Sequence, residues 1–336
     1  MTDLVSILIP ARNAERWIAE TIASALTQTW SRTEIIIVDD GSTDATLACA
    51  RQFDSKTVKV VTQSNQGAAA ARNTAFSLCQ GDYIQWLDAD DLLSPDKITK
   101  QMEARDRGRR TLLSCAWAAF MYRPHRARFR ATALWRDLTP AEWLIRKLAL
   151  HLQMQTATWL VSRELSDAAG PWDTRLVVDD DGEYFCRVLL ASDRVRFVPE
   201  GRVYYRVTDG NRLSHVGRST RKIEAEWLSV QLHIGYLRSL DDSQRVRAAC
   251  VTYLQNYLID FYPDRPDIVQ KAEALATELG GRLQMPTLSW KYDWIRRLCG
   301  WDAGKSIEEY LRWLKWSSLR RWDKAVRKFE ALLTRT

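Results

Sequence analysis

The chain has 336 residues, of which 46% are hydrophobic and 27% charged. This composition is typical of a globular protein and excludes disordered, collagen-like and low-complexity classes, and the length predicts about two domains. The formal net charge is only +7, and residues 305–336 hold nine basic and four acidic side chains. Because the rest of the chain is nearly neutral, we expect no nucleic-acid partner.

The six cysteines are far apart in the sequence, so they form neither a CxxC redox motif nor paired zinc ligands. Scattered single cysteines are typical of a reducing compartment. The first residues, MTDLVSILIP, contain an acid and only a short apolar run, which is unlike a signal peptide. No run of 18 apolar residues is present, so we expect no transmembrane helix and a cytoplasmic location.

The first ninety residues alternate short β-branched runs with helical patterns. We expect strands at 4–10, 34–38, 58–62 and 83–87, and helices at 14–29, 44–53 and 67–78. This alternation predicts an α/β fold with a mostly parallel, doubly wound sheet. Ligands bind such sheets outside the carboxyl ends of the strands. Three polar motifs lie at those ends: PARN (10–13), DDGS (39–42) and DADD (88–91).

The remainder of the chain changes character near residue 217. Residues 112–207 mix strand-like and helical stretches, whereas the pattern from 219 onward is almost wholly helical. We expect helices at 220–240, 243–261, 267–279 and 305–333. The sequence therefore predicts an α/β domain at 1–217 and a helical region at 218–336.

Three carboxylates, Asp88, Asp90 and Asp91, follow the fourth predicted strand. Clustered carboxylates repel one another and are costly to bury, so such a group usually needs a cation. Hard oxygen ligands favour magnesium or manganese shared with substrate phosphates. The alternative is a solvated turn that caps the next helix, and the DxD pattern alone does not decide between the two.

Four motifs taken in order resemble glycosyltransferase family 2: VSILIPARN, EIIIVDDGSTDAT, QGAAAARNTAF and GDYIQWLDADD. The resemblance extends over residues 1–215 and implies a GT-A fold with a Rossmann-like, mixed and mostly parallel sheet. It implies inverting transfer of a sugar from a nucleotide-sugar donor, preferably UDP-linked, to an acceptor hydroxyl. It also implies a divalent cation, Mn or Mg, and a glycan or lipid-linked glycan acceptor in cell-surface polysaccharide synthesis.

The resemblance also implies roles for individual residues near the donor. The expected nucleotide-binding residues are Pro10, Ala11, Asn13, Asp40, Arg72 and Asp88. Asp40 would accept a hydrogen bond from the base, which suits the N–H of uracil; its alternative role is a helix cap. Arg72 suits a phosphate or base edge, and its alternative is a surface salt bridge.

For the metal, the resemblance implies Asp90, with Asp91 assisting. The family often has a histidine after a late strand, but Thr208 occupies that place here. His215 lies seven residues further on and is the candidate replacement ligand; its alternative is a structural or exposed histidine.

A second acidic motif, DDDGE (179–183), precedes Arg187. Aligned on this arginine, Asp181 takes the family place of the catalytic base, and Asp180 is the base if the register is shifted by one residue. An acidic helix N-terminus is the simpler alternative. Glu183 and Trp172 are assigned to the acceptor side, although Glu183 could pair with Arg187 at i, i+4, and Trp172 could belong to the core.

The last predicted helix has an apolar stripe, and Trp313 and Trp316 lie on its other side among arginines. The stripe consists of Ile307, Leu311, Leu314, Trp322, Val326, Phe329 and Leu333. One interpretation is a lid packed on the preceding helices, which is slightly favoured because those helices need a cover. The other is an interfacial helix in peripheral contact with an anionic membrane at its inner face.

Two alternative functions remain open. A nucleotidyltransferase on a similar fold would carry a Gly-rich, Lys-containing signature after the first strand, which PARNAE lacks. A non-catalytic subunit that binds sugar nucleotides or glycans would not need a base, so the acidic motif at 179–183 argues against it.

Overall fold

The computed structural model describes residues 2–106, 108–208, 219–287, 298 and 300–333. Strands β1 (Val5–Ala11), β2 (Thr33–Asp40), β3 (Val58–Gln63) and β4 (Tyr83–Trp86) alternate with helices α1 (Ile18–Leu26), α2 (Thr46–Arg51) and α3 (Ala68–Leu78). The predicted order of elements is confirmed. Helix α1 is shorter than predicted because Ala14 forms a turn in which its amide donates to Thr46 Oγ1.

The first sheet has five strands in the order β3-β2-β1-β4-β7, with β7 at Val161–Ser162. Strands β1 to β4 pair in parallel, and β7 is antiparallel to β4. The predicted mostly parallel sheet is confirmed. β1 and β2 are buried along most of their length, as expected for parallel strands covered on both faces.

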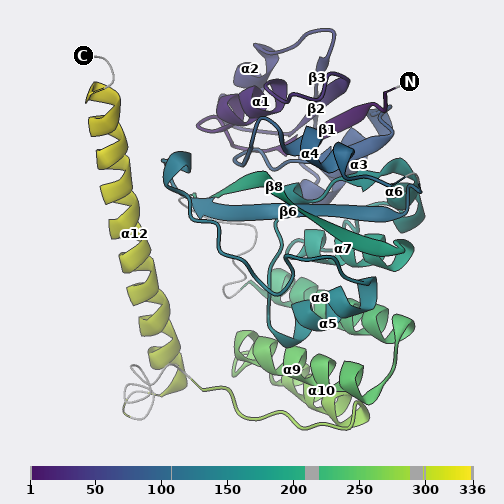
Figure 1. Ribbon diagram of the computed structural model, residues 1–336. Helices are drawn as coiled ribbons and strands as arrows, with labels where there is room; N and C mark the ends of the chain where they lie inside the picture. The colour runs from purple at the N-terminus through teal and green to yellow at the C-terminus, as the bar shows by residue number, and fades with distance from the viewer. Residues whose placement is uncertain (1, 107, 209–218, 288–297, 299, 334–336) are drawn as a thin grey trace.

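A second sheet of three strands, in the order β5-β8-β6, lies beside the first (Figure 1). It contains β5 (Leu92–Leu93), β6 (Thr111–Phe120) and β8 (Arg194–Arg206). β6 and β8 are parallel, whereas β5 is antiparallel to β8. Around these sheets lie α4 (Lys97–Glu103), α5 (Pro140–Ala149), α6 (Arg163–Ala169) and α7 (Asp180–Ala191).

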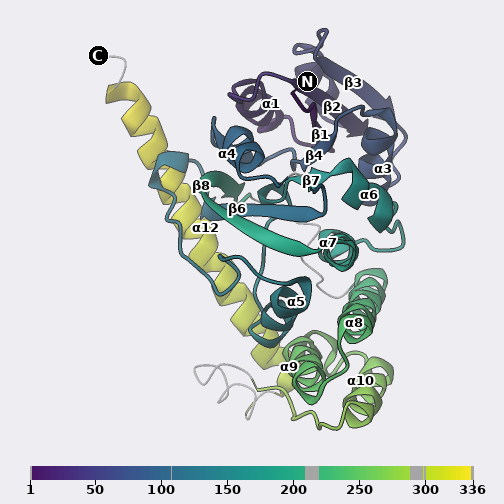
Figure 2. The same ribbon diagram turned by 45° about the vertical axis from the view of Figure 1, so that its right-hand side comes forward.

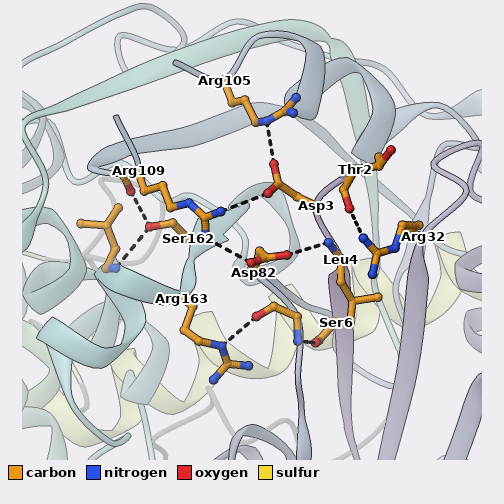
Figure 3. A network of polar contacts seen from close by, with 12 residues as sticks. Thr2, Asp3, Leu4, Ser6, Arg32, Asp82, Arg105, Arg109, Ser162 and Arg163 are labelled. Carbon is orange, nitrogen blue, oxygen red and sulfur yellow. Dashed lines mark hydrogen bonds and ion pairs between the residues drawn. The ribbon is translucent and has the colours of Figure 1, made fainter. Parts of the chain in front are cut away.

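A polar network joins the amino-terminal ends of the central strands (Figure 3). Asp3 accepts from Arg105 Nε and from Arg109 Nη2, both at 3.1 Å. Asp82, just before β4, accepts from the Leu4 amide at 2.9 Å. These contacts fix the edge of the sheet opposite to the strand ends that carry the three polar motifs, so they are structural.

The helical region contains α8 (Thr220–Leu240), α9 (Gln244–Phe261), α10 (Pro266–Glu278) and α12 (Trp301–Leu333). The predicted helices are confirmed. Helices α8 to α10 stack on the side of α7 away from the first sheet (Figures 1 and 2). The predicted boundary at 217 and 218 lies outside the described residues, but one buried apolar cluster runs from Leu8 in β1 to Ala276 in α10.

Helix α12 runs along the outside of the molecule in both views (Figures 1 and 2). Its apolar stripe is not buried against the other helices: Trp322 and Phe329 each keep 62% of their surface exposed. The interpretation of α12 as a packed lid is therefore wrong for the stripe. Among the described residues, no helix is long and apolar enough to cross a membrane.

Candidate active site

The polar motifs after β1 and β2 are joined to each other. Asn13 has a left-handed backbone, with φ of 50°. Its Oδ1 accepts from the Thr43 amide at 2.9 Å, and its own amide donates to Ser42 Oγ at 3.0 Å. The side chain of Asn13 therefore holds the PARN and DDGS loops together at the carboxyl edge of the sheet. Pro10 and Ala11 are the last residues of β1 at this edge.

Asp40, the predicted partner of the base, is buried and shapes the loop before α3. Its Oδ1 accepts from Gln63 Nε2 and from the Gln66 amide, and its Oδ2 accepts from the Gly67 amide, all at 2.8 Å. Gly67 has φ of 96°, a conformation that favours glycine. Asp40 thus organises the start of α3, and its contact with uracil stays a prediction.

Arg72 is buried and joins two parts of the site that are far apart in sequence. Its Nη2 lies 2.8 Å from Asp88 Oδ1, and its Nη1 lies 2.6 Å from Asp180 Oδ2. The guanidinium also lies 4.4 Å from the centre of the Trp172 ring. Burial opposes the charge, but Asp180 and Asp88 together raise the pKa of Arg72. The surface salt bridge considered for Arg72 is wrong, because this cation links the DADD motif to α7 inside the protein.

The N-terminus of α7 is held by a contact from α8. Asp179 precedes the helix with φ of 52°, and its Oδ2 accepts from Ser229 Oγ at 2.5 Å. His233 Nδ1 lies 3.7 Å from the same oxygen. A Cβ at Gly182 would lie 2.1 Å from Asp179 Oδ1, so the glycine makes room for this carboxylate. These anchors could not be predicted from local sequence patterns, because they pair residues about fifty positions apart.

Asp180 and Asp181 lie in the first turn of α7, the acidic helix start that was the simpler alternative. Burial, followed by the charges of Asp181 and Asp88, raises the pKa of Asp180 to about 6 despite the opposing Arg72. Burial and then Asp179 raise the pKa of Asp181. Asp181 Oδ2 accepts from Thr156 Oγ1 at 3.1 Å. The two acids therefore differ: one is ion-paired, and the other is bound by a neutral hydroxyl.

A small cavity of ≈ 20 Å³ lies next to Asp181. Its wall is largely apolar, with Trp143, Met154, Trp159 and Phe185, and it includes Lys147. The cavity has room for little more than a water molecule. The aromatic side chains in this wall form the apolar part of the surroundings of Asp181.

Glu183 and Trp172, assigned to the acceptor side, have structural positions. Glu183 is buried, and it binds Arg187 Nε at 2.7 Å and the Tyr236 hydroxyl at 2.7 Å. The predicted i, i+4 pair is confirmed. Trp172 is buried and stacks on Tyr184 with ring centres 4.1 Å apart. In the described residues Glu183 therefore braces α7 and Trp172 packs in the core, and their assignment to the acceptor side stays a prediction.

The DADD motif contains two partly exposed carboxylates and one buried carboxylate. Asp88 and Asp90 are partly exposed, whereas Asp91 is buried. Asp91 Oδ1 accepts from the Arg206 amide at 2.8 Å, and its Oδ2 is buried without a hydrogen-bond partner among the described residues. Burial, reinforced by Asp90 and Asp88, raises the pKa of Asp91 well above its ordinary value. Asp91 thus points into the protein, and its role as an assisting metal ligand stays a prediction.

The described residues contain no group of three or more His, Cys, Asp or Glu side chains that could hold a metal alone. His215 lies outside the described residues. Asp88 and Asp90 still offer hard oxygen atoms at the edge of the sheet. Magnesium is commonly held by one or two carboxylates together with substrate phosphates, so these residues fit a cation shared with a diphosphate.

Arg206 supports the DADD loop and was not identified from the sequence. It is buried between the rings of Trp17 and Phe120, at 4.4 and 4.5 Å from their centres. Its Nε donates to the Asp90 carbonyl at 2.7 Å, and its Nη2 pairs with Glu20 at 2.7 Å. Nothing in the local sequence separates this arginine from the exposed ones around it.

Comparison with known proteins places part of this site in a known family. Residues 6–165 match the family model of glycosyl transferase family 2. These residues belong to glycosyl transferase family 2. The matched region contains β1 to β4 and all three polar motifs but ends before α7, so the acidic start of α7 lies outside it.

Named relatives support the family match. The chain is 39% identical over 100 residues to the Escherichia coli UDP-Glc:alpha-D-GlcNAc-diphosphoundecaprenol beta-1,3-glucosyltransferase WfgD, covering 30% of this chain and 40% of WfgD. It is 27% identical over 254 residues to an uncharacterized glycosyltransferase of Rickettsia typhi, covering 73% of this chain and 75% of that protein. The chain spans less than half the length of several curated relatives that it matches.

Among solved structures, residues 1–349 of S. aureus TarS in complex with UDP-GlcNAc superpose with a TM-score of 0.67 at 17% identity. The superposition covers 82% of this chain and 81% of the TarS chain. At this identity the likeness concerns the fold, and it confirms the predicted GT-A architecture with additional C-terminal helices.

Proposed function

We propose that this protein is an inverting glycosyltransferase that moves a hexose from a UDP-linked donor to an acceptor hydroxyl. The observation that carries the proposal is the double ion pair of Arg72. It holds Asp88, in the donor-side motif, and Asp180, beside the candidate base, on one buried cation. The proposal is also supported by the UDP-sugar named in WfgD and by UDP-GlcNAc bound to TarS.

Asp181 is the proposed base. A sugar hydroxyl is a weak nucleophile, so a base must take its proton as the oxygen attacks the anomeric carbon and the bond to the diphosphate breaks. Inversion needs one base on the face opposite to the leaving group. Asp180 is held by Arg72, whereas Asp181 contacts the neutral Thr156 hydroxyl. Its raised pKa makes Asp181 a better proton acceptor than an ordinary aspartate.

Asp90 and Asp88 are the proposed ligands of a manganese or magnesium ion that also binds the donor diphosphate. When bound, the cation would stabilise the negative charge on the departing diphosphate. On the protein side, Arg206 and Arg72 hold the two carboxylates: Arg206 binds the Asp90 backbone, and Arg72 binds the Asp88 side chain.

The proposed acceptor is a glycan or a lipid-linked glycan of the cell surface. WfgD is named for an acceptor that carries diphosphoundecaprenol. An acceptor of this class would bring the protein to the cytoplasmic face of a membrane. The nucleotidyltransferase and the non-catalytic subunit remain the alternatives to be tested against this proposal.

The test is UDP release from UDP-glucose and UDP-GlcNAc, with and without manganese, in the wild type and in Asp181→Asn. We expect the variant to lose turnover while retaining UDP binding, because the base acts only on the attacking hydroxyl or water. The matched control is Asp193→Asn, which removes an exposed carboxylate just after α7. Asp180→Asn should lower turnover less than Asp181→Asn.

The outcomes separate the alternatives. A reversed order of the two α7 variants would make Asp180 the base. Donor binding without turnover in the wild type would favour a non-catalytic subunit. Formation of a UDP-sugar with release of inorganic diphosphate, in a parallel assay with UTP and a sugar 1-phosphate, would favour a nucleotidyltransferase. Full turnover in both α7 variants would refute the mechanism.

A further inference from the structure

Helix α12 faces the rest of the protein with its charged side. Asp323 pairs with Arg123 Nη2 at 2.7 Å, and Arg123 Nη1 pairs with Glu330 at 2.9 Å. Arg327 pairs with Glu20 on α1 at 2.8 Å. An ordinary surface helix buries its apolar stripe and turns its charges to water. In α12 this arrangement is reversed.

One row of apolar side chains on α12 points away from the body, whereas the exposed Trp313 and Trp316 lie on other sides of the helix. Trp322, at the edge of this row, also lies 5.3 Å from the Arg123 guanidinium. We define the outer stripe as Ile307, Leu311, Leu314, Trp322, Phe329 and Leu332, which are 36–64% exposed. At 100° per residue these positions fall on one side of the helix, opposite Asp323 and Glu330. They extend over about 40 Å at 1.5 Å per residue. An exposed apolar surface of this length is unusual on a soluble monomer and indicates a binding surface.

The charges on the exposed part of α12 are basic. Lys315, Arg321 and Lys328 are exposed along the borders of the outer stripe, whereas Lys324 lies 5.8 Å from the centre of the Tyr122 ring in the body. The acidic residues Asp323 and Glu330 both form ion pairs with Arg123, on the side of α12 that faces the body. The outward surface of the helix around the stripe is therefore positively charged, which matches a negatively charged partner.

A basic loop lies next to this helix and extends the charged surface. It follows β6 and contains Arg126, Arg128 and Arg130, all exposed. The loop is tied to α12 because Arg123 binds Asp323, and His125 lies 3.5 Å from Glu330. The end of β6 approaches α12 in both views (Figures 1 and 2). Helix and loop thus present their basic side chains from neighbouring positions.

We propose that α12 is an interfacial helix that binds an anionic lipid bilayer. The outer stripe enters the boundary between headgroups and acyl chains, and the bordering lysines and arginines contact anionic headgroups. A second copy of the chain fits the outer stripe less well than a bilayer does. Two stripes packed together would bring their basic borders close to each other, with no acidic residues to pair with them. This inference goes beyond the proposed transfer reaction and does not depend on it.

The test is flotation of the full-length protein with vesicles of phosphatidylcholine, and with vesicles containing 30% phosphatidylglycerol (an experimental choice of about a physiological anionic fraction). We expect binding only to the anionic vesicles and its loss at high salt. In one variant Leu311, Leu314 and Phe329 become Ser, and in another Lys315, Arg321 and Lys328 become Glu. At ~1 kcal/mol for each basic residue, the charge variant should bind at least about 100-fold more weakly.

Matched controls use residues away from α12. Leu150→Ser removes an exposed leucine after α5, and Arg51, Lys56 and Lys59 changed to Glu reproduce the same charge change near α2 and β3. Both controls should bind vesicles as the wild type does. The stripe variant should keep the wild-type unfolding temperature, because its altered side chains are exposed.

The results decide between occupants. Equal binding of the wild type and the stripe variant would overturn the proposal. The proposal would also be overturned if the wild type did not bind vesicles but formed a dimer, and if the stripe variant were a monomer. The outer stripe would then bind a second copy of the chain. Equal binding to neutral and anionic vesicles would refute the role of the basic border. UDP release in solution is independent of each of these results.

Discussion

Replacing Arg72 with Met removes the cation that neutralises Asp88 and Asp180. Met has a similar length but loses the guanidinium that lies over the Trp172 ring, and it leaves the Asp88 and Asp180 carboxylates without their shared cation. Removing one partner of a buried ion pair costs ~3–5 kcal/mol. The Asp88 side chain is 30% exposed, so water compensates for part of this loss. We therefore expect Arg72→Met to lower the free energy of unfolding by about 3 kcal/mol.

The ion-pair argument makes a sharper prediction for the double variant. Asp180→Asn removes the carboxylate that Arg72→Met leaves unpaired, so the double variant should be more stable than Arg72→Met alone by about 1–2 kcal/mol. For a chain of this length the entropy of unfolding is roughly 0.7 kcal/mol/K, so the single variant should lose about 4 °C in Tm. The assay is urea and thermal unfolding of the four proteins in the cycle. Turnover should stay lost in the double variant, because the donor motif and α7 are no longer joined.

Arg163→Met is the matched control. Arg163 also lies over an aromatic ring, that of Phe76, but its guanidinium donates to the carbonyls of Gly81 and Cys79. Its loss leaves no carboxylate unpaired, so Asp180→Asn should not rescue it. If Arg72→Met lowered the free energy of unfolding by less than ~1 kcal/mol, or if the double-variant cycle showed no coupling energy with Asp180, the proposed double ion pair of Arg72 would be refuted.

Two further predictions concern the cation and the pH dependence of stability. Asp90→Asn should abolish the manganese dependence of UDP binding measured by calorimetry while the fold is retained, and unchanged metal dependence would show that Asp90 is not a ligand. Burial, followed by Asp260 and Asp179, raises the pKa of Glu226 from its ordinary value of 4.5 to about 8. Because the folded-state pKa is raised, the stability from the protonated carboxyl is fully present below pH 4.5 and is lost as the pH rises through about 8. Glu226→Gln should remove this loss of unfolding free energy, which is about 3 kcal/mol at pH 7. The measurement is the free energy of unfolding of both proteins between pH 5 and 8, and an equal pH dependence in the two would contradict the prediction.

The sequence predicted the first sheet because its strands are continuous apolar runs that end in polar motifs. It did not predict the second sheet, because β5 has only two residues, Leu92 and Leu93, and is defined by pairing with Tyr204 and Val203 far along the chain. Local periodicity does not contain such pairings. The helical region was predicted closely because its apolar residues repeat at helical spacing.

The sequence predicted where the candidate site residues lie along the chain better than it predicted which side chains contact one another. The three strand-end motifs and the acidic helix start were found from their residue types. The interior orientation of Asp91 was not, because it depends on Arg206, which is distant in sequence. The core position of Trp172 was one of two alternatives, and its stacking on Tyr184 favours that alternative. The same holds for Arg72 and Asp180, whose pairing joins residues 108 positions apart.

The anchoring of Asp179 by Ser229 places the start of α7 under the control of α8. Within the family segment, Arg72 and Thr156 bind Asp180 and Asp181, whereas the residue just before α7, Asp179, is held by Ser229 from outside that segment. A change in α8 would therefore shift the start of α7 while leaving strands β1 to β4 unchanged. Chimaeras between relatives should exchange acceptor preference most cleanly when α7 and its supporting helices are transferred as one block.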